Sequence, residues 1–91
     1  MDTYLWDPEK NEWLIENRGL SFERITCLIE AGAVLDIIQH PNAERYPKQR
    51  MFIINIDNYA HLVPFVETEG DIFLKTIIPS RKATKQYLGG S

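Results

Sequence analysis

The basic residues near the C-terminus are the strongest chemical signal in this sequence. Residues 75–91 contain Lys75, Arg81, Lys82 and Lys85 and no acid, although the whole chain has a net charge of −3. Such cations could hold a phosphodiester and stabilise the charge of its transition state. RNA cleavage through the 2′-hydroxyl then needs only a base and an acid, so no metal is required. Spacing alone favours a solvated helix end, where cations are favourable near the helix C-terminus. A phosphate site and a solvated helix end therefore both remain open as interpretations.

A histidine in a predicted strand is the second candidate for chemistry. His61 could carry a proton, but its neighbours Val63 and Phe65 favour a half-buried packing role. His40 and His61 share no helical or hairpin spacing, so no metal site is expected. Cys27 lies among glutamates that disfavour its thiolate, which argues against a nucleophile. The scattered glycines form no phosphate-binding loop, so no cofactor is expected.

Length and composition indicate one folded domain. The 91 residues are 44% hydrophobic and 25% charged, which excludes a disordered chain. One cysteine excludes an internal disulfide framework. No apolar run reaches the ~18 residues of a membrane helix, and no signal peptide is recognised, so we expect a cytoplasmic protein without membrane contact.

Capping residues and hydrophobic periodicity predict an α+β fold. Helices are expected over 8–18, 22–31 and 81–88, and strands over 4–6, 33–39, 50–57, 59–67 and 71–78. The expected architecture is two N-terminal helices packed on a four-stranded antiparallel sheet, with the short first strand added and a small C-terminal helix. Residues 1–88 would form the single domain, and 89–91 a flexible tail.

Two local features of the predicted strands can be checked directly. Asp57-Asn58 and Glu69-Gly70 are expected to form the tight turns that join successive strands. Pro64 cannot donate a ladder hydrogen bond, so we expect it at a sheet edge or in a bulge.

Two stretches resemble the signatures of BrnT-type toxins. Trp6–Lys10 followed by Gly19–Glu23 is similar to the N-terminal signature, and Ile77–Thr84 with Tyr87 after it is similar to the C-terminal one. The resemblance implies a RelE-like fold and a ribonuclease toxin of a type II toxin–antitoxin system. It also implies a ribbon–helix–helix antitoxin as partner.

The resemblance also suggests site residues. Arg81 and Lys82 match the cations of the C-terminal motif, and Arg50 matches an arginine that opens the third strand. The chain departs from the family at Arg18, where a histidine is usual, and arginine cannot serve as a base because it does not deprotonate. It departs also at Thr76, where an arginine is common.

The leading hypothesis is therefore a metal-free mRNA endonuclease toxin. Its expected residues are Arg50, Arg81 and Lys82 on the phosphate, His61 or Lys75 in proton transfer, and Lys75, Lys85 and Tyr87 in RNA contacts. The alternative is a non-catalytic module that keeps the fold and binds an antitoxin-like partner. A third hypothesis is self-association, as a homodimer, through a free sheet edge.

Overall fold

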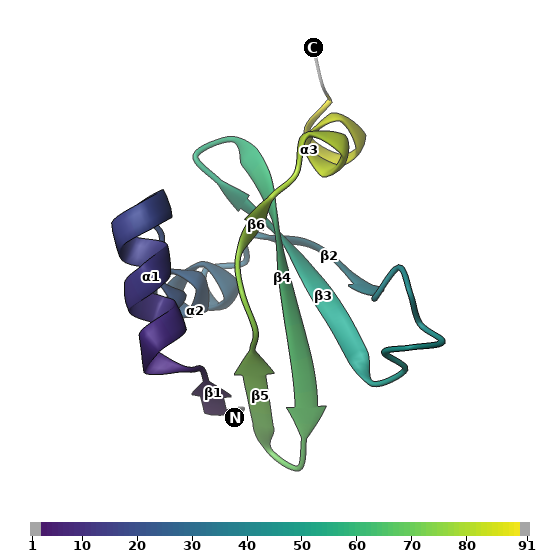
Figure 1. The fold of residues 1–91 in the computed structure, drawn as a ribbon. Helices are drawn as coiled ribbons and strands as arrows, with labels where there is room; N and C mark the ends of the chain where they lie inside the picture. The colour runs from purple at the N-terminus through teal and green to yellow at the C-terminus, as the bar shows by residue number, and fades with distance from the viewer. Residues whose placement is uncertain (1–2, 90–91) are drawn as a thin grey trace.

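The computed structural model describes residues 3–89, which form an α+β fold with three helices and a mixed, open six-stranded sheet (Figure 1). The elements in chain order are β1 (Thr3–Leu5), α1 (Pro8–Arg18), α2 (Phe22–Glu30), β2 (Val34–Gln39), β3 (Gln49–Ile56), β4 (Tyr59–Thr68), β5 (Asp71–Leu74), β6 (Ile78–Pro79) and α3 (Arg81–Leu88). Of the predicted tail 89–91, only Gly89 lies within the described residues, where it caps α3 in the left-handed conformation.

The helix boundaries follow from local capping. The Asp7 side chain accepts the Glu9 N–H, and Gly19 ends α1 with φ at 65°. The Ser21 hydroxyl accepts the Arg24 N–H at the start of α2, and the Ser80 hydroxyl accepts the Ala83 N–H at the start of α3. The predicted bounds of α1 and α3 are confirmed, and α2 ends one residue earlier than predicted.

The sheet is mixed, so the prediction of an antiparallel sheet is wrong for one pairing. The strand order is β1-β5-β4-β3-β2, and β6 pairs with β4 beside this path. All pairings are antiparallel except β1 with β5, which is parallel. Tight turns fix the direction of β4 and β5, whereas no hairpin joins β1 to its neighbour, so local sequence does not set its direction. The predicted turn at Asp57-Asn58 is confirmed, with both residues at positive φ.

The predicted strand 71–78 is interrupted, and Pro64 lies at the interruption. β5 pairs with the end of β4 and β6 pairs with its beginning, which leaves residues 75–77 outside the sheet. The Lys75 N–H donates to the Pro64 carbonyl at 2.8 Å. The N–H and C=O of one strand residue point to the same side of the strand. The N–H that Pro64 lacks would therefore have pointed at residues 75–77, where no strand pairs with β4. Pro64 is therefore in an interior strand without a bulge, contrary to the prediction, and the neighbouring strand is broken instead.

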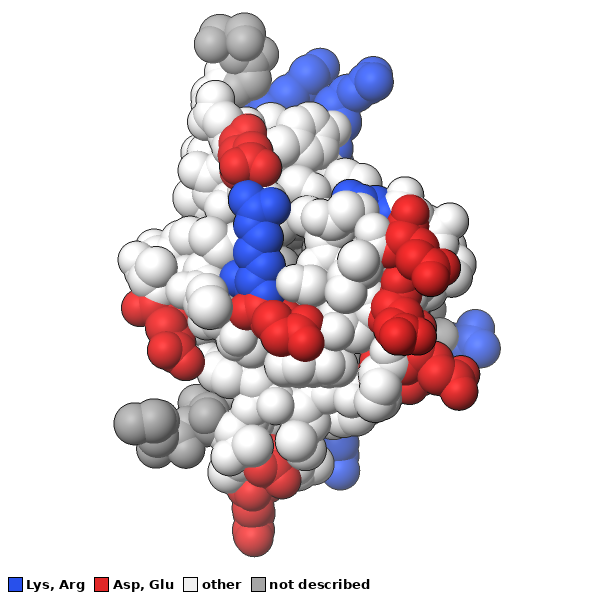
Figure 2. Space-filling view, turned by 90° about the vertical axis from the view of Figure 1, so that its left-hand side faces the viewer, with Lys and Arg blue, Asp and Glu red and all other residues white. Residues whose placement is uncertain are grey.

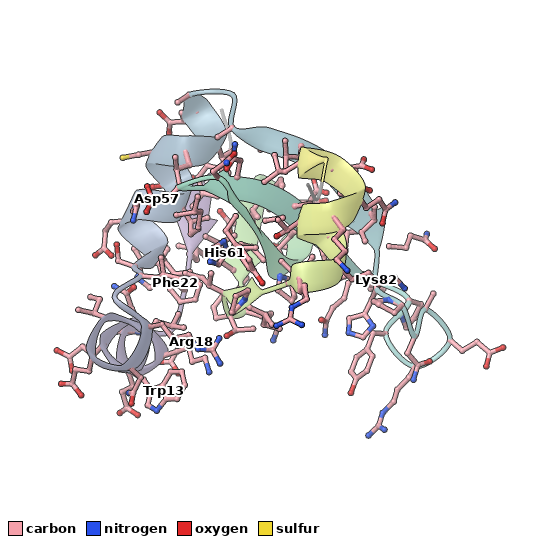
Figure 3. All side chains as sticks on the ribbon, turned by 90° about the horizontal axis from the view of Figure 1, so that it is seen from above. Trp13, Arg18, Phe22, Asp57, His61 and Lys82 are labelled. Carbon is pink, nitrogen blue, oxygen red and sulfur yellow. The ribbon has the colours of Figure 1, made fainter. Side chains whose placement is uncertain are left out.

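The sheet carries helices on both faces. Figure 3 shows α1 and α2 on one side of the strands and α3 on the other. One core cluster joins the first two helices to β3, β4 and β5, and its fully buried members include Leu14, Phe22, Ile25, Ile54, Val63 and Leu74. A smaller cluster joins Ala83 of α3 to Ile53 and Ala60 on the opposite face. Alternation along β4 thus decides whether a side chain faces α1 and α2 or α3.

A buried amide joins α1 to α2. Asn11 is only 7% exposed, and its Oδ1 accepts the Phe22 N–H at 2.8 Å. Its Nδ2 donates to Glu23 Oε1 at 2.7 Å. Asn11 therefore satisfies a backbone donor in the first turn of α2 that has no partner within the helix.

Replacing Asn11 by alanine is expected to lower the free energy of unfolding by about 1–3 kcal/mol, because the Phe22 N–H is left buried without an acceptor. Urea unfolding measures the loss. Asn17→Ala is the matched control, since the exposed Asn17 side chain donates only to the Trp13 carbonyl of its own helix. A loss of the same size in both variants would contradict the assigned role of Asn11.

Candidate functional site

His61 is the only histidine that the structure buries within residues 3–89, and its ring has a defined tautomer. It lies on the β4 face that carries α1 and α2 and is 8% exposed. Its Nδ1 lies 2.9 Å from the Tyr59 carbonyl oxygen. Because a carbonyl only accepts, Nδ1 is the protonated nitrogen and Nε2 of the neutral ring carries the free lone pair. Among residues 3–89, no hydrogen bond occupies Nε2.

The surroundings keep His61 neutral. Burial is the main cause that lowers its pKa below the ordinary value of 6.5, and the charges of Arg24 and Arg18 act in the same direction. The hydrogen bond to Tyr59 and the charge of Asp57 oppose this shift without cancelling it. At neutral pH, His61 is therefore unprotonated and able to accept a proton.

Arg18 brings a guanidinium to the same surface. It is the last residue of α1, and its Nη1 donates to the Ile77 carbonyl just before β6. Its guanidinium also lies 5.2 Å from the centroid of the Trp13 ring. Figure 3 shows Arg18 reaching from α1 toward the strands, with Trp13 beside it. From the sequence, Arg18 stands out only as a residue that cannot carry a proton. Its position beside the strands follows from Gly19, which ends the helix there.

An exposed ion pair links α2 to the turn that precedes His61. Arg24 of α2 contacts both carboxylate oxygens of Asp57, at 3.1 and 3.2 Å. Asp57 belongs to the tight turn between β3 and β4, so this pair ties the turn to α2. Sequence reasoning missed the pair because its members are 33 residues apart.

Of the predicted cations of α3, Arg81 is the first after β6, but α3 lies on the face of the sheet opposite to the one that carries His61. Pro79 of β6 lies opposite His61 in the sheet, and Arg81 follows two residues later as the first residue of α3. Figure 3 shows Lys82 on the far side of α3 from His61. Arg81, Lys82 and Lys85 are exposed, and none forms an ion pair in the described part of the chain.

Arg50 and Lys75 lie elsewhere on the sheet. Arg50 forms an ion pair with Glu67 and lies opposite Phe65, four residues along β4 from His61. At ~3.3 Å per strand residue, this separation is about 13 Å. Lys75 lies in the gap after β5, with its Nζ 5.2 Å from the centroid of the Phe73 ring. The structure therefore does not gather Arg50, Arg81 and Lys82 around one point.

Tyr87 faces the sheet. Its hydroxyl donates to Asp36 Oδ2 at 2.7 Å, and its ring packs against the smaller core cluster. This hydrogen bond is the main cause that raises the Tyr87 pKa above its usual value of 10.0. The contact ties α3 to β2, which is a structural role.

His61 is buried but does not line a pocket in the described part of the chain. No pocket is found within residues 3–89, and the same residues contain no cluster of three or more side chains suited to a metal. No helix in this part of the chain has the length and apolar character to cross a membrane. Figure 2 shows acidic side chains spread over the face of α1 and α2. An anionic ligand would therefore have to approach His61 from the side of Arg18.

Comparisons with family models, with curated proteins and with solved structures give no match for this chain.

The lowered pKa of His61 predicts acid sensitivity. Below the unfolded value of about 6.5, the unfolded chain binds a proton that the native His61 resists, so the free energy of unfolding falls as pH decreases toward the folded pKa. Urea unfolding between about pH 8 and pH 5 measures this fall. His61→Gln should remove part of the pH dependence, and an unchanged pH profile in that variant would contradict the prediction.

Proposed function

We propose that this chain is the toxin of a type II toxin–antitoxin system, with a RelE-like fold and metal-free endoribonuclease activity on mRNA in the cytoplasm. Its partner would be a ribbon–helix–helix antitoxin. One observation carries the proposal. His61 is neutral, its Nε2 accepts no hydrogen bond within residues 3–89, and the charge of Arg18 acts on its ring. His61 also pairs with Pro79 of β6, the strand that precedes Arg81 in the chain. The two sequence motifs that resemble BrnT-type toxins support it as well.

The proposed reaction is transfer of the RNA phosphodiester to its own 2′-hydroxyl. His61 Nε2 accepts the 2′-hydroxyl proton, the 2′-oxygen bonds to phosphorus, and the bond to the 5′-oxygen breaks. The products are a 2′,3′-cyclic phosphate and a 5′-hydroxyl, which regains a proton from the histidinium or from water. Arg18 and Arg81 would stabilise the charge that grows on the phosphate oxygens, while Lys82 and Lys85 attract the strand.

Induced expression in bacteria tests this proposal. The wild type should arrest growth and deplete RNA, whereas Arg81→Ala/Lys82→Ala and His61→Gln should restore growth. Arg81 and Lys82 are exposed, and glutamine at position 61 can still donate to the Tyr59 carbonyl, so the variants should accumulate as folded protein. Healthy growth and intact RNA with the wild type would contradict a nuclease toxin.

A non-catalytic, antitoxin-binding module is the second candidate. Two observations favour it: Arg50 is paired with Glu67 away from His61, and several acidic side chains are spread over the face of α1 and α2. This candidate predicts unaffected growth together with stable binding of a ribbon–helix–helix protein. Growth arrest that depends on His61 would exclude it.

A further inference from the structure

The outer edge of β2 carries few of the features that protect sheet edges. β2 is the last strand of the order, so one of its sides has no neighbouring strand in residues 3–89. Its sequence, Val34–Gln39, contains no lysine and no proline, and its one charge is Asp36. Exposed edges usually carry lysine, proline or strong bulges that prevent another strand from pairing. Here the only irregularity is a register shift between Val34 and Asp36.

Backbone geometry shows which groups of β2 face outward. The His40 N–H donates to the Gln49 carbonyl at 3.1 Å, toward β3. Because the pairing groups of an antiparallel strand alternate, Ile38 also faces β3, whereas Ile37 and Gln39 face away. The Ile37 N–H agrees with this alternation, since it donates to Asp36 Oδ1 at 2.8 Å and not to β3.

One carboxylate covers this edge. Asp36 Oδ1 accepts the Ile37 N–H, while Oδ2 accepts the Tyr87 hydroxyl from α3. The Ile37 side chain remains 46% exposed on the face of α1 and α2. The edge thus combines an exposed apolar side chain with a backbone donor whose present acceptor is a side-chain carboxylate.

We propose that two copies of this chain associate through β2, with the strands antiparallel and Ile37 on the two-fold axis. The outward N–H and C=O of Ile37 would pair with those of Ile37 in the second copy, and the two exposed isoleucine side chains would meet on one face.

The charge pattern of β2 fits a second copy as the occupant. In the register centred on Ile37, each Asp36 lies opposite Ile38 of the other copy, so the two carboxylates do not face each other. The two-fold arrangement uses the same edge on both copies and closes the assembly as a dimer. Pairing exchanges the Asp36 acceptor of the Ile37 N–H for a carbonyl, so it costs no unsatisfied donor.

Sedimentation equilibrium up to about 1 mM protein tests the association. The wild type should approach twice the monomer mass as concentration rises, and Ile37→Lys should remain monomeric. Ile15→Lys is the matched control, because Ile15 of α1 is similarly exposed at 49% and lies away from β2. A wild type that is monomeric throughout would overturn the proposal, as would a dimer that Ile37→Lys leaves unchanged.

Oxidative cross-linking tests the register. The Cα atoms of a hydrogen-bonded antiparallel pair lie about 5.5 Å apart, a separation that a disulfide can span. With the exposed Cys27 changed to serine, Ile37→Cys should form a covalent dimer much faster than Ile15→Cys. Equal rates of dimer formation would overturn the proposed register, and circular dichroism establishes that both variants are folded.

Discussion

Under the proposed nuclease function, replacing His61 by glutamine is expected to lower the rate of RNA cleavage by about 10²–10⁴-fold, the usual contribution of a positioned general base. Glutamine keeps an amide that can donate to the Tyr59 carbonyl, but it cannot take a proton from a 2′-hydroxyl. The burial that lowers the His61 pKa keeps Nε2 available at neutral pH. Single-turnover cleavage of a labelled single-stranded RNA measures the effect on the chemical step.

His40→Gln is the matched control for this prediction. His40 lies outside the candidate site, in the segment after β2, where its Nδ1 accepts the Asn42 N–H and its ring contacts Tyr46. The control should cleave RNA at the wild-type rate. The wild-type rate should also decrease as pH falls through the lowered pKa of His61, because the protonated ring no longer accepts a proton. Equal rates for wild type and His61→Gln would exclude His61 as the base.

The helices could be predicted because their boundaries depend on neighbours within one turn. Asp7, Ser21 and Ser80 each accept a backbone N–H two or three residues away, and Gly19 ends α1 in a conformation that glycine adopts easily. The hairpin turn at Asp57-Asn58 is equally local. Such features need no knowledge of the rest of the fold.

The sheet was predicted less well because its errors involve distant residues. The direction of β1 depends on how α1 and α2 return the chain to the sheet, which no turn motif encodes. The break after β5 lies beside Pro64, which is one strand away and at least eleven residues earlier in the chain. Pro64 is tolerated in this interior strand because the neighbouring strand is interrupted at the place where the missing N–H would have donated.

The candidate site was only partly accessible to sequence reasoning. The sequence places Arg81, Lys82 and Lys85 on one helix. Only the pairing of β6 with β4 shows that Pro79 lies opposite His61, two residues before Arg81. Tyr87 contacts Asp36 from 51 residues away, so its position toward the sheet has no local signal. Burial of His61 agrees with the packing role that its neighbours suggested, and the available Nε2 adds the chemistry.

Phe22 is the residue whose truncation should destabilise the fold most. Its side chain is fully buried, and its ring stacks on Trp6 with the centroids 5.7 Å apart. Phe22→Ala is expected to lower the free energy of unfolding by about 3–5 kcal/mol, since the removed ring leaves a cavity between α2 and the sheet. A domain of this size is stable by only about 5–15 kcal/mol, so the variant approaches the limit of folding. Urea unfolding followed by circular dichroism measures the loss.

Phe73→Ala is the matched control because Phe73 of β5 is only half-buried and faces away from α1 and α2. It should lower the free energy of unfolding clearly less than Phe22→Ala does.

Truncation of Phe22 should also change the surroundings of His61, because α2 carries Arg24, which pairs with Asp57 in the turn before His61. The chemical shift of the His61 ring protons should therefore change in folded Phe22→Ala and not in Phe73→Ala. Equal losses of stability in the two variants would mean that α2 is not firmly packed on the sheet. The idea that α2 positions His61 through the Arg24–Asp57 pair would then be wrong as well.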